Sequence, residues 1–178
     1  MNVFYLSSDP IQAAQWMVDK HVVKMILESA QLLSTAHRVL DGVEFNGVSA
    51  TGRKKKSWVL RDGRELKLYQ ATHINHPSAI WSRQSVENYT WLVDHMFALM
   101  QEYTYRYGKH HKVETDGLAY LLQSPPYNLR DYEFTTPPSA MAPEYILGYD
   151  PVENYRNYYK QGKAHLHKWT KRTPPDWM

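Results

Sequence analysis

The sequence predicts a mainly α-helical protein, a single helical domain over residues 1–178 with a small β-hairpin insertion at about 43–69. Two long segments, 10–40 and 76–108, repeat apolar residues at the three- and four-residue spacing of an amphipathic helix. The segment between them loses that period and contains a strong turn signal. With 178 residues and 43% hydrophobic content, the chain is long enough to bury one core of its own.

Residues 10–40 are expected to form one long helix, either straight or kinked. Asp9 stands where an N-cap is needed, Pro10 suits the first helical position, and Asp41-Gly42 ends the pattern. This helix holds both the apolar core positions and an unusual set of ionisable groups.

The hairpin is expected from the runs SWVL and ELKLY, which flank the sequence RDGR. Asp62-Gly63 would form its two-residue turn. His76-Pro77-Ser78 then opens a second long helix as a capped entry, and this helix should end near Gly108.

The last third of the chain begins with a short helix expected at 116–123. The proline-rich stretch 124–150 can hold neither a helix nor a central strand, so we expect a loop. Asp150-Pro151 begins the final helix, to about 169, within a C-terminal helix and tail that spans 151–178.

The composition excludes several classes of site. There is no cysteine, so disulfides and thiolate metal sites are excluded, and nothing indicates an oxidising compartment. The N-terminus lacks a basic start followed by a long apolar core, and no apolar run approaches the roughly 18 to 20 residues of a membrane span. We therefore expect a cytoplasmic protein without membrane contact.

The charge is only mildly basic, with a formal value of +3. Its distribution is more informative than its sum. One basic cluster is Arg53 to Lys56, and a second is interleaved with tyrosines and a tryptophan near the C-terminus, at Lys160, Lys163, Lys168, Lys171 and Arg172. Cations among aromatic rings suit a phosphate backbone and unstacked bases, although lysine stems packing on rings of a solvated helix would give the same pattern.

A polar face on the first helix is the strongest functional signal. At 100° per residue, a sector of about 80° contains His21, Lys24, Glu28, Gln31 and Thr35, opposite the apolar side. Burying such a stripe is costly unless its members bond to each other or to a ligand. The face is therefore either a functional cleft or solvated surface, and both readings stay open at this point.

Three segments resemble the bacteriophage pyrimidine-dimer DNA glycosylase (endonuclease V) family. In that family Asp-x-His precedes the catalytic glutamate by seven residues on the first helix, and Asp19-Lys20-His21 followed by Glu28 has this spacing. The segments 105–112 and 155–164 are similar to two later family segments, in the same order. The first segment also looks like the opening of a widespread group of tailed-phage proteins without an established activity.

The resemblance implies a helical enzyme that binds duplex DNA, flips a nucleotide and cuts an N-glycosidic bond in an infected bacterial cell. Glu28 would be the catalytic carboxylate, with His21 and Lys24 beside it. No cofactor and no metal is expected. The residues expected to contact DNA or a nucleotide are Lys20, Gln31, Arg38, His73, His76, Arg83, Tyr158, Tyr159, Lys160 and Lys163.

Residue 2 departs from the family pattern. The family's nucleophile is the α-amine exposed when the initiator methionine is removed before threonine, whereas Asn2, before which methionine is usually retained, stands here. The strand-nicking lyase step is therefore left open, with water or Lys24 as the alternative nucleophile. Leu27 and Gln31 also replace the family's flanking arginines, so the substrate base stays undetermined.

Two other functions fit the same residues. A non-catalytic module could retain the pocket to bind a nucleotide or a partner. A metal-dependent hydrolase could use His73, His76, Asp94 and His95 together with His21, although their spacing matches no known ligand pattern. The sequence does not predict the oligomeric state.

Overall fold

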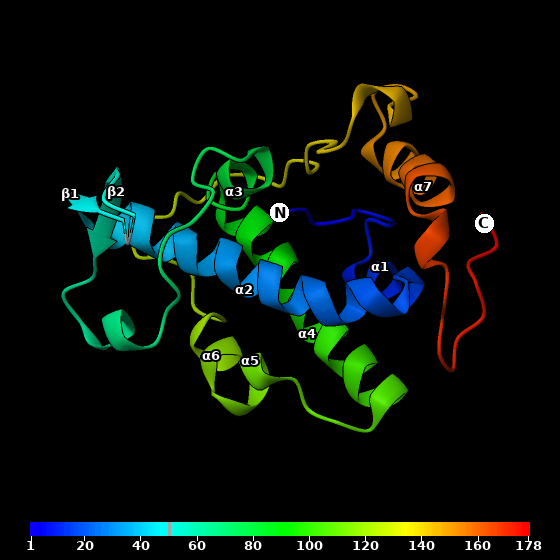
Figure 1. Ribbon diagram of the computed structural model, residues 1–178, viewed down its shortest axis with the longest axis horizontal. Helices are drawn as coiled ribbons and strands as arrows, with labels where there is room; N and C mark the ends of the chain where they lie inside the picture. The colour runs from blue at the N-terminus through cyan, green and yellow to red at the C-terminus, as the bar shows by residue number, and fades with distance from the viewer. Residues whose placement is uncertain (50) are drawn as a thin grey trace.

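The computed structural model describes residues 1–49 and 51–178 and confirms a mainly helical fold with a small antiparallel hairpin. Two long helices, α2 (Asp19–Asp41) and α4 (Val86–Tyr107), cross and pack against each other, and α1 (Pro10–Trp16) packs on α4 (Figure 1). The hydrophobic core fills the space between them. Its fully buried side chains include Met25, Leu33, Leu92, Met96 and Leu99.

The prediction of one helix over 10–40 is wrong, because the helix breaks at Met17 and Val18. Both residues are extended and fully buried. The Met17 carbonyl accepts a hydrogen bond from Arg106, and the Asp19 N–H donates to the carbonyl of Lys168. Backbone groups that a continuous helix would use internally are thus paired with distant segments.

The hairpin insertion is present, but its turn is not where the sequence predicts it. The strands are β1 (Val43–Val48) and β2 (Lys54–Val59), with Phe45 opposite Ser57. Instead of forming the hairpin turn, Asp62 caps a short 3-10 helix, η1 (Gly63–Leu66), by accepting from the Arg64 N–H. An Asp-Gly pair can serve either purpose, since the Asp side chain bonds readily to backbone two residues on.

Arg38 anchors the hairpin and the segment after it to α2. Its side chain is fully buried, and its guanidinium donates to the carbonyls of Trp58, Glu65, Leu68 and Tyr69 and to the Glu65 carboxylate. The Glu65 carboxylate also accepts from the Leu60 N–H. Arg38 is therefore structural, and its burial does not agree with the expectation that it contacts a ligand.

The second long helix is likewise divided, into α3 (Pro77–Trp81) and α4. His76 caps α3 as expected, since its Nδ1 accepts from the Ser78 N–H at 3.2 Å. The buried Asn88 side chain donates to the Trp81 carbonyl, which pairs the end of α3 with the start of α4. Gly108, with φ +65°, ends α4 as predicted because glycine adopts the left-handed conformation without strain.

The remaining segments are short. In place of one helix at 116–123 the chain forms α5 (Lys112–Thr115) and α6 (Leu118–Leu121). Residues 124–150 contain only the 3-10 turn η2 (Pro143–Tyr145), as the prolines predict. The final helix, α7 (Pro151–Gly162), ends before the expected 169 and is followed by η3 (Ala164–Leu166).

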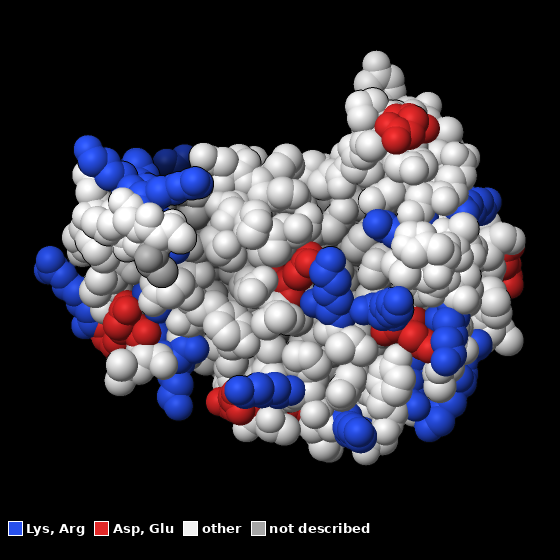
Figure 2. All heavy atoms as spheres, in the orientation of Figure 1, with Lys and Arg blue, Asp and Glu red and all other residues white. Residues whose placement is uncertain are grey.

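The long loop runs across the molecule from the hairpin end to α7 (Figure 1). It is held by side chains of the helices: the Asp41 carboxylate accepts from the Tyr127 N–H at 2.9 Å, and Asn88 accepts from the Thr135 N–H at 2.8 Å. Figure 2 shows Lys and Arg side chains gathered over the hairpin end and over the end that carries α7 and the C-terminal tail. Among the described residues, no helix has the length and apolarity that crossing a membrane requires.

Three buried histidines should make stability depend on pH. Burial lowers the pKa of His21 to about 3, of His37 to about 4 and of His95 to about 3, against an ordinary value of 6.5. His95 is fully buried and stacks on Trp91 at 4.9 Å between ring centroids.

We expect the free energy of unfolding to fall as pH decreases from about 6.5 towards 4. In this range the three histidines bind protons in the unfolded chain but stay neutral in the folded protein. The slope reaches about 1.4 kcal/mol per pH unit for each histidine. Urea unfolding at pH 7.5, 6 and 5 measures it. His95→Phe should flatten the slope and His110→Gln, at an exposed position, should not; equal stability at pH 7.5 and 5 would contradict this account.

Candidate active site

Glu28 lies at the centre of a cluster of nitrogen atoms. Its Oε2 accepts a hydrogen bond from the Asn2 N–H at 3.0 Å and lies 3.7 Å from the amino nitrogen of Met1. Its Oε1 lies 3.2 Å from the Nζ of Lys24, one turn earlier on α2. The Glu28 side chain is only 11% exposed, whereas that of Lys24 is 65% exposed. The carboxylate is thus sheltered, with an exposed cation at its outer edge.

The side chain of Asn2 fixes the first residues against Glu28. Its Oδ1 accepts from the N–H groups of Val3 and Phe4, and its Nδ2 donates to the carbonyl of Ala140 at 2.8 Å. Phe4 has φ +49°, a left-handed conformation that is strained for a bulky residue. This turn and the contact with the proline-rich loop hold the backbone nitrogens on the carboxylate.

His21 lies two turns before Glu28 and forms the inner wall. Its Nδ1 is 2.6 Å from the hydroxyl of Tyr159, and its ring stacks on Phe4 at 4.2 Å between centroids. Burial, with the nearby charge of Lys163 and Lys24, lowers the pKa of His21 to about 3, and burial raises the pKa of Tyr159 well above 10. The pair is therefore neutral near pH 7 and shapes the site without adding charge.

His76, which caps α3, is close enough to the cluster to be influenced by its charges. The pKa of His76 is lowered, chiefly by burial and then by the positive charge of the Met1 amino group. The Glu28 carboxylate opposes this shift, so His76 is within electrostatic reach of both the amino group and the carboxylate. His73, two residues after Ala71, is exposed and has φ +48°; its Nδ1 is 2.8 Å from the Thr72 hydroxyl.

The loop 72–76 is shaped by two further side chains, one from α2 and one from the turn between α3 and α4. Thr35 exchanges hydrogen bonds with the backbone of Thr72, and Arg83 donates to the carbonyls of Ile74 and Ala79, each at 2.6 Å. Both guanidinium groups expected to contact a ligand, Arg38 and Arg83, thus bind backbone carbonyls of the protein.

The C-terminal helix supplies the other wall. Tyr159 is fully buried against His21, whereas Tyr158 is half-buried and lies parallel to Phe4 at 6.2 Å between centroids. The Nζ of Lys163 sits 4.7 Å from the centre of the Tyr158 ring. Lys160 is exposed on α7, and Gln31 is half-buried on α2. Tyr159 is thus the member of the expected basic-aromatic run that contacts His21, and Tyr158 and Lys163 lie beside this pair.

Comparisons with protein-family models, curated proteins and solved structures gave no match. The chemistry has to be inferred from the side chains themselves.

The set of residues considered for a metal site does not come together. Within residues 1–49 and 51–178 there is no group of three or more His, Cys, Asp or Glu side chains that could hold a metal ion. His95 is fully buried behind Trp91, while its neighbour Asp94 points outward and is exposed.

Two contributors to the site, Phe4 and the loop around Ala140, were not predicted from the sequence. The signal for Phe4 was the apolar start VFYL at 3–6, which had to be buried somewhere; Val3 and Leu6 are in fact at most 1% exposed. Ala140 contributes only its backbone carbonyl oxygen, and a contact of this kind cannot be predicted from a pattern of side chains.

Proposed function

We propose that this protein is an N-glycosylase that acts on a base of DNA or of a nucleotide, with Glu28 as the catalytic carboxylate. The observation that carries the proposal is the position of the Met1 amino nitrogen and the Asn2 nitrogen on Glu28 Oε2, at 3.7 and 3.0 Å. An amine beside a glutamate of the first helix is what the resemblance to the pyrimidine-dimer DNA glycosylases implies. The nitrogens of residues 1 and 2 both lie within 4 Å of the carboxylate.

The reaction breaks the bond between the sugar C1′ and the base nitrogen. The base leaves with the bonding electron pair and takes up a proton, while positive charge develops on the sugar. The Glu28 carboxylate stabilises that charge and accepts a proton from the attacking group. If the attacking group is the amine, a Schiff base forms at C1′; if it is water, an abasic sugar results.

The surroundings suit such a substrate. A base within a duplex is reached only after it leaves the stack, and the half-buried ring of Tyr158 with Lys163 beside it offers a surface for an aromatic, phosphate-bearing ligand. Lys24, exposed beside Glu28, supplies a cation for a substrate phosphate.

The second candidate is a non-catalytic module that binds a nucleotide or a partner at this cluster. The observation that favours it is the shelter of Glu28, whose two oxygens already contact protein nitrogens and whose side chain is 11% exposed. Such a module would bind its ligand through Lys24 and the Tyr158 wall and would release no base.

Trapping with borohydride tests the proposal. Purified protein is incubated with duplex DNA containing ultraviolet-damaged bases or abasic sites, with and without borohydride, and its intact mass is measured. We expect a covalent adduct that peptide mapping places on the first residue of the chain, and we expect Lys24→Gln to retain it because Lys24 is not the nucleophile.

Base release without an adduct would support the water route at the same carboxylate. Neither base release nor an adduct, on damaged duplex or on free nucleotides, would contradict the glycosylase and favour the binding module. Chemical acetylation of the α-amine should abolish the adduct, which provides the control for chain-end specificity.

A further inference from the structure

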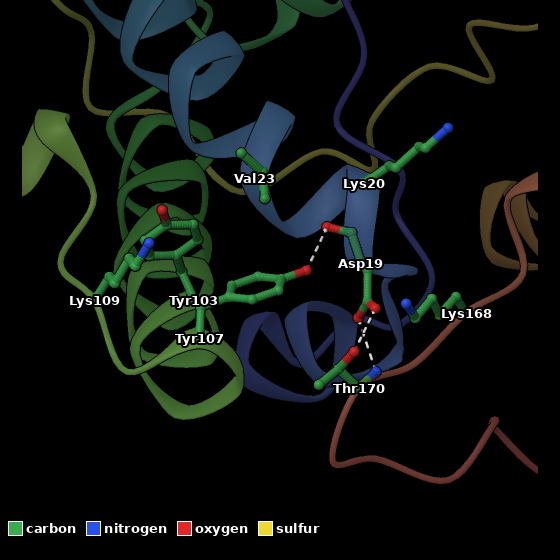
Figure 3. Close-up of a pocket in the computed structure, with 8 residues that line it drawn as sticks. All are labelled: Asp19, Lys20, Val23, Tyr103, Tyr107, Lys109, Lys168 and Thr170. Atoms are coloured by element: carbon green, nitrogen blue, oxygen red, sulfur yellow. Dashed lines mark hydrogen bonds between the residues drawn. The ribbon is translucent and has the colours of Figure 1, made fainter.

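A separate cavity of about 430 Å³ lies between the first turn of α2, the end of α4 and the C-terminal tail (Figure 3). Its volume is in the range of small-molecule pockets. The cavity shares no side chain with the cluster around Glu28. Val23, Tyr103 and Tyr107 form its apolar and aromatic wall. Its cationic edge consists of Lys20, Lys109 and Lys168.

Two tyrosines one turn apart on α4 form the aromatic wall. The ring centroids of Tyr103 and Tyr107 are 5.2 Å apart, and both side chains are half-buried. The Tyr107 hydroxyl donates to the Asp19 carbonyl at 3.4 Å, and Tyr103 packs edge-on against His111. The rings are thus held in place with part of their surface towards the cavity, which suits a planar, apolar part of a ligand.

The negative charge at the cavity is already compensated. The Asp19 carboxylate accepts hydrogen bonds from Arg106 at 3.0 Å and from the backbone and hydroxyl of Thr170 at 2.9 and 2.7 Å. Although burial opposes it, these hydrogen bonds from Thr170 and Arg106 lower the pKa of Asp19, so the group is ionised and paired.

The lysines at the cavity have no such compensation. Lys20, Lys109 and Lys168 are exposed, and none forms an ion pair with the part of the chain that the structure describes. In Figure 3, Lys109 and Lys168 lie on opposite sides of the Tyr107 side chain, and Lys20 extends outward from the edge. The cavity therefore combines an aromatic wall with excess positive charge and fits an anion attached to a planar ring.

We infer that this cavity binds a nucleotide, its base against Tyr103 and Tyr107 and its phosphate at the lysines of the cavity edge. The nucleotide belongs either to a nucleic-acid strand or to the free pool, and the chemistry of recognition is the same. Lys20 precedes Glu28 by two turns of α2, about 12 Å along the helix axis, so one strand can extend along both sites. The inference does not depend on the proposed activity, because the two sites share no residue.

Direct binding tests the inference with two probes, a fluorescein-labelled oligothymidylate and the mononucleotides AMP and TMP. Lys109→Gln/Lys168→Gln should weaken binding of the effective probe at least tenfold and reduce the salt dependence of oligonucleotide binding. Tyr103→Leu should weaken it about five- to tenfold. The matched control is Lys67→Gln/Lys112→Gln, which removes the same charge at exposed positions outside the cavity.

Folding is not at risk in the lysine variant, because both residues hold the fold through backbone carbonyls: that of Lys168 accepts from the Asp19 N–H and that of Lys109 from the Thr104 hydroxyl. Tight binding of the oligonucleotide alone would assign the cavity to a strand, and tight binding of a mononucleotide would assign it to the free pool. The inference is overturned if neither probe binds, if the cavity variants bind like the control, or if the loss is confined to the lysine variant.

Binding is measured in the Glu28→Gln background as well as in the unchanged protein. In the unchanged protein, binding without any base release rejects the proposed function alone. Base release combined with unaffected cavity variants rejects the nucleotide cavity alone.

Discussion

Replacing Glu28 by glutamine should reduce the rate of base release at least a thousandfold, equivalent to about 4 kcal/mol of transition-state stabilisation. The amide has the same shape, so it still accepts the hydrogen bond from the Asn2 N–H. It carries no negative charge, however, and can neither stabilise a cationic sugar nor take a proton from the attacking amine. Single-turnover base release measures the effect.

Affinity for the substrate separates this result from misfolding. Glu28→Gln should bind the same DNA within about threefold of the unchanged protein, since the carboxylate acts mainly in the transition state. Glu114→Gln, the same substitution beside His110 on α5, should leave the rate unchanged. If the unchanged protein releases no base and binding instead depends on Lys24 and Tyr158, the binding module is the better description.

Replacing Arg38 by methionine should lower the free energy of unfolding by about 3 to 5 kcal/mol. The substitution keeps much of the side-chain volume but leaves the carbonyls of Trp58, Leu68 and Tyr69, among others, without their donor. A buried carbonyl that loses its charged donor is left without a hydrogen bond, and the folded state then carries the full free-energy cost of removing that carbonyl from water. Urea unfolding of the variant gives the change directly.

Two further variants sharpen that measurement. Arg38→Lys keeps the charge but lacks the planar fork that bonds several acceptors at once, so it should recover only part of the loss. Arg61→Met, at an exposed position, should change stability by less than about 0.5 kcal/mol. A loss below 1 kcal/mol in Arg38→Met would mean that the hairpin is held by packing alone.

Local signals predicted the element ends that local chemistry controls. Asp9 caps α1, His76 caps α3, Asp150 caps α7, and Gly108 ends α4. The breaks inside the long helices could not be predicted in this way. At Met17 the apolar spacing continues unchanged, and the break depends on Arg106, which is 89 residues away in the sequence.

The candidate site could likewise be predicted only in part from the sequence. Helical periodicity placed His21, Lys24 and Glu28 on one face, and the structure brings Lys24 to 3.2 Å from Glu28. Periodicity could not decide whether water or protein covers that face, because the cover is irregular. Asn2 and Phe4 belong to an irregular segment whose path is set by the hydrogen bonds of Asn2 to Glu28 and Ala140 and by the stacking of Phe4 on His21.

The candidate site joins the two ends of the chain, and this affects how the protein is made. The Asn2 contact with Ala140 and the His21 contact with Tyr159 each span 138 residues. During synthesis, α2 leaves the ribosome long before the loop and α7 that cover it, so Glu28 stays uncovered until most of the chain has been translated. Loops this long are closed late and slowly in folding. A nascent or truncated chain therefore contains the Glu28 carboxylate without the segments that enclose it. Under the proposed function, activity arises only when folding is nearly complete.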